Sequence, residues 1–92
     1  MTPQDHLALI HRLDCVVCRF RHGHTTPAVE AHHIQYVRDQ YSDWATVPLC
    51  KACHDLLHQM RRRAFYNLTH LDDAKILALT LKLIEEYYES GR

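Results

Sequence analysis

The 92-residue sequence has few of the residues that interrupt regular structure, with two glycines and three prolines. Because 47% of its residues are hydrophobic, the chain is expected to be folded rather than disordered. It has no run of about 18 apolar residues, so no membrane span is expected. It also lacks an initial basic region followed by an apolar core. No signal peptide is therefore visible, and a cytoplasmic protein is expected.

The sequence also lacks net charge, because 11 Lys and Arg residues balance 11 Asp and Glu residues. This balance argues against a nucleic-acid binder that depends on electrostatic attraction alone. The one dense basic run is Arg61, Arg62 and Arg63. It is interpreted either as a solvated helix end or as a contact to phosphate groups of a nucleic acid.

Cysteine, by contrast, is present in a regular spacing. Cys15 and Cys18 form one C-x2-C pair, and Cys50 and Cys53 form a second. Two sulfurs so spaced reach one ion from a single turn, so the four thiolates predict a structural Zn²⁺ site. Residues 1–92 are expected to form a single small domain, which buries only about two-thirds of its unfolded surface and gains stability from the metal. A redox dithiol and four merely buried cysteines are the alternatives.

Histidine is abundant, with nine residues, and four of them have an informative spacing. His54 and His58 are four apart on an expected helix, so they share one face and can share a metal ion. His32 and His33 are adjacent on an expected strand, so they point to opposite faces. One of these two can join the helix pair as a ligand, and the other can act as a general base. The remaining histidines are interpreted as surface or loop residues without a role: His6, His11, His22, His24 and His70.

The first half of the chain predicts a helix and a pair of strands. Thr2 and Pro3 are suited to begin a helix that runs to about residue 13. Alternating apolar residues predict a strand over residues 28–34. An antiparallel second strand is expected over residues 46–49, where Pro48 confines it to an edge or an end. The other segments are loops over 21–27 and 35–44, and a helix over 51–63 whose buried side is Leu56, Leu57 and Met60.

The strongest helix pattern covers residues 71–90. Asp72 and Asp73 favour its N-terminal dipole, and Gly91 is suited to stop it. Its apolar side chains cover an arc of about 200°, against about 100° for an ordinary surface helix. The wide arc predicts either a homodimer contact through this helix or coverage by the first helix.

These motifs together resemble those of the HNH endonucleases, the ββα-metal nuclease group. The similar segments are Cys15-x2-Cys18, Val29-Glu-Ala-His-His-Ile34 and Val47-Pro-Leu-Cys-Lys-Ala-Cys-His54-x3-His58. The resemblance spans residues 15–58 and is closest to small four-cysteine members from bacteria and phages. It implies an α+β fold, in which a zinc-stapled ββα-metal core over residues 14–63 is flanked by an N-terminal helix and a long C-terminal helix. It also implies that His33 is the general base, and that His32, His54 and His58 bind a catalytic Mg²⁺, Mn²⁺, Ni²⁺ or Zn²⁺ ion.

The sequence departs from the family pattern at one position. The family has a middle Asn that braces the loop between the strands and orients the base, and its place here is taken by Ala45. Asn67, the one asparagine of the chain, lies beyond the motif. Asp43 is the candidate to replace the missing side chain, although it could equally cap a turn before Trp44.

The leading functional hypothesis is therefore a metal-dependent DNA endonuclease that nicks or cleaves with low sequence specificity. In this hypothesis the metal acts as a Lewis acid on the phosphodiester and its leaving group. The alternative is a non-catalytic zinc module that binds nucleic acid or protein and carries a decayed nuclease site. A redox or metal-storage protein would leave the pairing of His32 with His33 unexplained.

Overall fold

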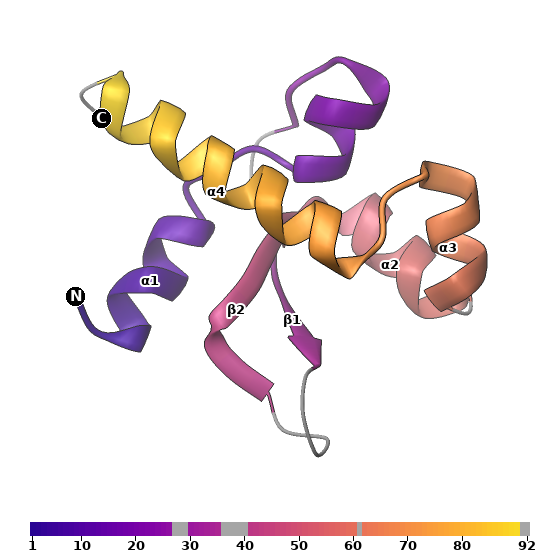
Figure 1. Ribbon diagram of the computed structural model, residues 1–92, viewed down its shortest axis with the longest axis horizontal. Helices are drawn as coiled ribbons and strands as arrows, with labels where there is room; N and C mark the ends of the chain where they lie inside the picture. Colours follow the sequence, from indigo (N-terminus) through magenta and orange to yellow (C-terminus); the bar gives the residue numbers. More distant parts are fainter. Residues whose placement is uncertain (27–29, 36–40, 61, 91–92) are drawn as a thin grey trace.

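The chain folds as a two-stranded antiparallel sheet surrounded by helices, an α+β arrangement (Figure 1). The computed structural model describes residues 1–26, 30–35, 41–60 and 62–90. Among these residues, no helix has the length and apolar character needed to cross a membrane. In chain order the elements are α1 (Pro3–Ile10), the π-helical turn η1 (Cys18–His22), β1 (Glu30–Gln35), β2 (Tyr41–Leu49), α2 (Lys51–Gln59), α3 (Arg62–Thr69) and α4 (Asp73–Glu89).

Helix α1 begins where the sequence predicts. Thr2 Oγ1 accepts a hydrogen bond from the backbone N–H of Asp5 (3.1 Å), and the Asp5 carboxylate accepts one from the N–H of Thr2 (2.9 Å). This capping box satisfies two N–H groups that have no partner inside the helix. The expectation that His6 is a surface residue is wrong, because His6 is buried and its ring packs against Trp44 with centroids 5.2 Å apart. His6 lies on the same face of α1 as Leu9 and Ile10, and this face packs toward β2.

Strands β1 and β2 form the expected antiparallel hairpin, but its second strand is longer than the sequence suggests. Residues 41–44, expected to be loop, belong to β2. The pairing runs regularly from Glu30 opposite Leu49 to His33 opposite Thr46, and it then shifts so that Gln35 lies opposite Tyr41. Five residues of β2 are thus matched by two of β1, which produces a bulge in β2. Positions 28 and 29 of the predicted first strand lie outside the described residues.

The helix expected over residues 51–63 is wrong as a single element. Helix α2 ends at Gln59, Met60 has an extended backbone (φ −92°, ψ 155°), and α3 follows. The turn at Met60 directs α3 so that Phe65 is completely buried in the core. Leu57 and Met60 are half-buried as expected for one side of a helix, whereas Leu56 is 37% exposed rather than buried.

Helix α4 crosses the front of the molecule in Figure 1 and packs against β2. Asp72 caps it by accepting a hydrogen bond from the N–H of Lys75 (2.8 Å), close to the predicted start. Its inner side buries Ile76, Thr80 and Leu83. The predicted stop at Gly91 lies outside the described residues.

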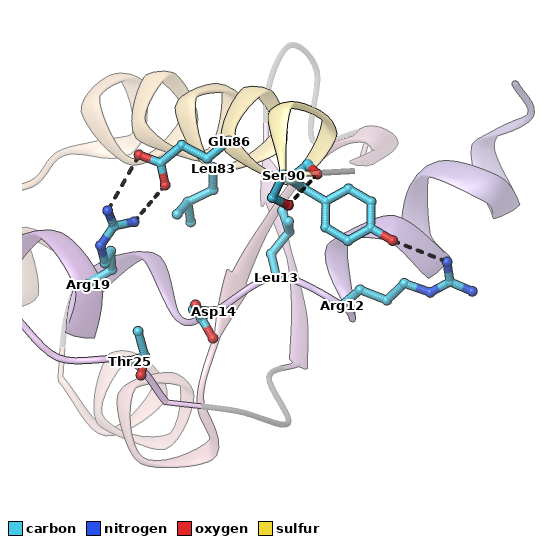
Figure 2. Close-up of a pocket in the computed structure, with 9 residues that line it drawn as sticks. Arg12, Leu13, Asp14, Arg19, Thr25, Leu83, Glu86 and Ser90 are labelled. Carbon is cyan, nitrogen blue, oxygen red and sulfur yellow. Dashed lines mark hydrogen bonds and ion pairs between the residues drawn. The ribbon is translucent and has the colours of Figure 1, made fainter. Parts of the chain in front are cut away.

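Two polar contacts hold the C-terminal half of α4 against the N-terminal part of the chain (Figure 2). The Arg19 guanidinium of η1 donates to both oxygens of the Glu86 carboxylate, at 2.8 and 3.4 Å, which raises the pKa of Arg19 and lowers the pKa of Glu86. Arg12, just after α1, donates to the hydroxyl of Tyr87 (3.4 Å). The outer side of α4 stays exposed to solvent, with Leu81 60% exposed and Tyr88 56% exposed.

Candidate functional site

The four cysteine side chains meet in the core as the spacing predicts. All four are buried and reduced, and their sulfur atoms lie within 4.8 Å of one another. The Sγ atom of Cys18 is 3.8 Å from that of Cys50 and 3.9 Å from that of Cys53. Four sulfurs around one Zn²⁺ at about 2.3 Å would be about 3.8 Å apart in a tetrahedron. The cluster therefore fits a structural metal such as zinc.

In each cysteine pair, one sulfur accepts a backbone hydrogen bond. The N–H of Cys18 donates to the Sγ atom of Cys15 (3.5 Å), and the N–H of Cys53 donates to that of Cys50 (3.4 Å). Cys50 is also the N-cap residue of α2. The two tight turns thus direct one sulfur of each pair toward the backbone and keep all four in one cluster.

Contacts within the cluster favour the thiolate form of Cys15 over that of Cys53. A hydrogen bond from the Cys53 thiol lowers the pKa of Cys15 to about 5. The same hydrogen bond, together with burial, raises the pKa of Cys53. Four neighbouring thiolates repel one another in the core, so a bound cation is needed to keep all of them deprotonated.

A second cluster consists of the three histidines that the sequence predicts as ligands. His32 comes from β1, and His54 and His58 come from successive turns of α2. The Nε2 atom of His54 lies 3.2 Å from Nδ1 of His32 and 3.0 Å from Nε2 of His58. Two nitrogens bound to one ion at about 2.0–2.1 Å are separated by about 2.8–3.4 Å for bond angles between 90° and 109°. These three nitrogens could therefore hold one divalent cation.

One residue of this site was not predicted. The Nδ1 atom of His54 lies 2.9 Å from Oε2 of Glu30, the first residue of β1. The side chain of His54 is 18% exposed and that of Glu30 is 45% exposed. The available sequence signal is the position of Glu30 two residues before His32, because residues i and i+2 of a strand lie on one face.

His33 lies against Asp43 and not in the cluster of its neighbour His32. Its Nε2 atom is 2.8 Å from Oδ1 of Asp43, and both side chains are partly exposed. The bulge in β2 makes this contact possible, because it removes Asp43 from the regular register beyond Thr46. Thr46 is fully buried and donates its hydroxyl hydrogen to the backbone carbonyl of Asp43 (3.0 Å), which fixes the turn of the chain.

The position expected for the bracing Asn offers no polar side chain. Ala45 is buried, at 7% exposure, and lies within the same bulge as Asp43. For the second interpretation of Asp43, a cap before Trp44, no backbone N–H in the described part of the chain is seen to donate to its carboxylate, whose observed partner is His33. The carboxylate that could orient His33 is therefore two residues away from the family position.

The arginine run is only partly described. Arg61 lies outside the described residues, and so does the side chain of Arg62. Arg63 is exposed in the first turn of α3. A role of Arg61, Arg62 and Arg63 in nucleic-acid binding stays a prediction.

Comparisons with other proteins add no assignment. Searches of protein-family models, of curated proteins and of solved structures gave no match to this chain. The functional interpretation therefore depends on the two clusters, on the His33–Asp43 pair and on the resemblance of the motifs.

Proposed function

We propose that the chain is a metal-dependent endonuclease of the HNH type that hydrolyses phosphodiester bonds of DNA. The observation that carries the proposal is the arrangement of β1, where two adjacent histidines have different partners. His32 belongs to the three-histidine cluster, with Nδ1 3.2 Å from Nε2 of His54, whereas His33 is paired with a carboxylate. A metal-binding group and an oriented imidazole side by side are what metal-assisted hydrolysis requires.

His32, His54 and His58 are the residues that would hold the catalytic cation, which can be Mg²⁺, Mn²⁺, Ni²⁺ or Zn²⁺. A bound cation would supply Lewis-acid stabilisation of the scissile phosphate and of the leaving oxygen. Three neutral imidazoles leave the charge of the ion uncompensated, which favours an anionic phosphodiester as the additional ligand. The buried cysteine cluster would hold a separate zinc ion with a structural role.

His33 is the residue we assign to the activation of water. A carboxylate can only accept a hydrogen bond, so Asp43 favours the tautomer of His33 with hydrogen on Nε2. Nδ1 then carries the lone pair that can take a proton from the attacking water. Asp43 also stabilises the imidazolium that forms, and it acts as a positioning residue in place of the missing Asn.

The basic run after α2 is the DNA contact surface that we propose. Arg61, Arg62 and Arg63 follow directly after the helix that carries His54 and His58. Guanidinium groups at this place could bind phosphates on either side of the scissile bond. A second copy of the chain, joined through α4, would add basic residues to this small surface.

A non-catalytic zinc module that binds nucleic acid or protein is the second candidate. Two observations favour it, which are Ala45 at the position of the family Asn and the formal net charge of zero. In this alternative the zinc cluster keeps its structural role, and the histidines have no reaction to perform.

A plasmid-nicking assay with Mn²⁺ or Mg²⁺ separates the two candidates. We expect the wild type to convert supercoiled DNA and His33→Ala to lose this activity while its zinc content stays unchanged. His11→Ala, an exposed histidine at the end of α1, is the matched control and should retain activity. A folded, zinc-loaded wild type that leaves the plasmid intact with every divalent metal would reject the enzyme.

A further inference from the structure

Glu30 has a chemical relation to the three-histidine cluster that its place in the sequence does not reveal. His54 is the central member of that cluster, because its Nε2 atom faces both other histidines. Its other ring nitrogen, Nδ1, lies 2.9 Å from the Glu30 carboxylate. We infer that Glu30 is a positioning residue of this metal site, acting through His54. The inference rests on the proposed metal site and is independent of nuclease activity.

The hydrogen bond selects the tautomer that a metal ligand needs. A neutral imidazole carries hydrogen on one of its two nitrogens, and only the other nitrogen can bind a cation. Since the Glu30 oxygen is an acceptor, His54 must donate from Nδ1. Its lone pair is then on Nε2, the nitrogen that faces His32 and His58.

The position of Glu30 also fixes the ring of His54 relative to the hairpin. Glu30 pairs with the fully buried Leu49, and the next residue, Cys50, caps the helix that carries His54. Glu30 and His32 are two residues apart on β1, so both side chains leave the same face of the strand. The His54–Glu30 contact therefore connects this face of the hairpin to the first turn of α2.

Convergence of the three nitrogens is poorly explained by hydrogen bonds among the histidines. With its hydrogen on Nδ1, His54 offers one lone pair at Nε2, yet two ring nitrogens lie within 3.2 Å of it. One lone pair accepts one good hydrogen bond, so a hydrogen bond to Nε2 of His54 accounts for only one of these two short distances. A cation between the three lone pairs accounts for all of these distances together.

The test measures metal affinity rather than cleavage. Zinc-loaded protein is titrated with Mn²⁺ and with Co²⁺ by isothermal titration calorimetry, and the Co²⁺ visible spectrum reports the ligands. Loss of a carboxylate that orients a metal-bound histidine costs about 10- to 100-fold in affinity. We expect a loss in this range for Glu30→Ala and a smaller one for Glu30→Gln, whose amide oxygen can still accept from Nδ1.

Asp55→Asn is the matched control because it also removes one negative charge close to His54, in this case from α2. Asp55 lies on α2 and forms an exposed ion pair with Lys51 (3.2 Å). Its affinity for Mn²⁺ and Co²⁺ should stay within about twofold of the wild type, the change expected of an exposed ion pair. His54→Ala should abolish binding of the second metal equivalent.

A purely structural tie between β1 and α2 gives a different result. In that case Glu30→Ala lowers the melting temperature of zinc-loaded protein without added Mn²⁺, but Mn²⁺ affinity stays at the wild-type value. This outcome overturns the inference, and so does a wild type that binds a single equivalent of metal. A second equivalent that depends on Glu30, in a protein that leaves DNA intact, upholds the inference and rejects the nuclease.

Discussion

Replacing Cys50 by Ser should remove the structural metal and unfold the chain. The substitution is selective, because Cys50 is both a predicted zinc ligand and the N-cap residue of α2. A serine hydroxyl is a good N-cap but does not replace a thiolate on zinc. The helix cap is therefore retained while the metal ligand is lost.

The magnitude follows from the size of the chain and the place of the cluster. At roughly 0.05–0.15 kcal/mol per residue, 92 residues give a net stability of about 5–14 kcal/mol. Structural zinc contributes about 10–16 kcal/mol in small zinc-finger peptides. The free energy of zinc binding is thus as large as the whole expected free energy of unfolding. The cysteines also belong to the buried core together with Val16, Val17 and Leu49, so the chain cannot lose the cluster locally.

The assay combines circular dichroism with a measurement of bound zinc. Cys50→Ser and chelator-treated wild type should both lack a cooperative thermal transition. His58→Ala, which removes an exposed histidine from the same helix, should melt within a few degrees of the wild type. A zinc-free Cys50→Ser protein that melts like the wild type would show that the cysteines are merely buried residues.

Two further predictions concern the hairpin and α4. Asp43→Asn should slow plasmid nicking by no more than the about 10²–10⁴-fold that general-base catalysis contributes, with normal zinc content, and an unchanged single-turnover rate would remove Asp43 from the mechanism. If the exposed side of α4 joins two copies of the chain, sedimentation of the wild type should show a concentration-dependent dimer. Leu81→Glu should abolish this dimer. Leu68→Glu, a substitution at a similarly exposed position on α3, should not change it. A wild type that stays monomeric at high concentration refutes the dimer.

The parts of the fold that sequence could predict are those specified by neighbouring residues. The cap at Thr2 depends on the next three residues, and it is confirmed. The acidic residues at 72 and 73 likewise mark the start of α4, close to the predicted position. The convergence of the cysteines was predictable because two matched pairs have a single common solution around one ion. In each case the signal lies within a few positions of the chain.

The parts that sequence could not predict depend on contacts between distant elements. The segment around Met60 contains no glycine or proline, so its local preference is helical, yet burial of Phe65 requires a turn there. The bulge that brings Asp43 to His33 depends on the pairing of β2 with β1, which alternation alone does not encode. Glu30 was missed for the same reason, because its partner is on α2.

The two clusters are connected through the first turn of α2. Cys50 is the N-cap of that turn and Cys53 lies in it, and the N–H of His54 donates to the carbonyl of Cys50 (2.9 Å). A metal held by the cysteines therefore sets the position of His54 through the backbone. His58 is exposed and His54 is only partly buried, whereas all four cysteines are buried in the core. We therefore expect loss of the cysteine metal to disrupt the histidine cluster by unfolding the chain, and loss of a histidine ligand to leave the cysteine cluster folded.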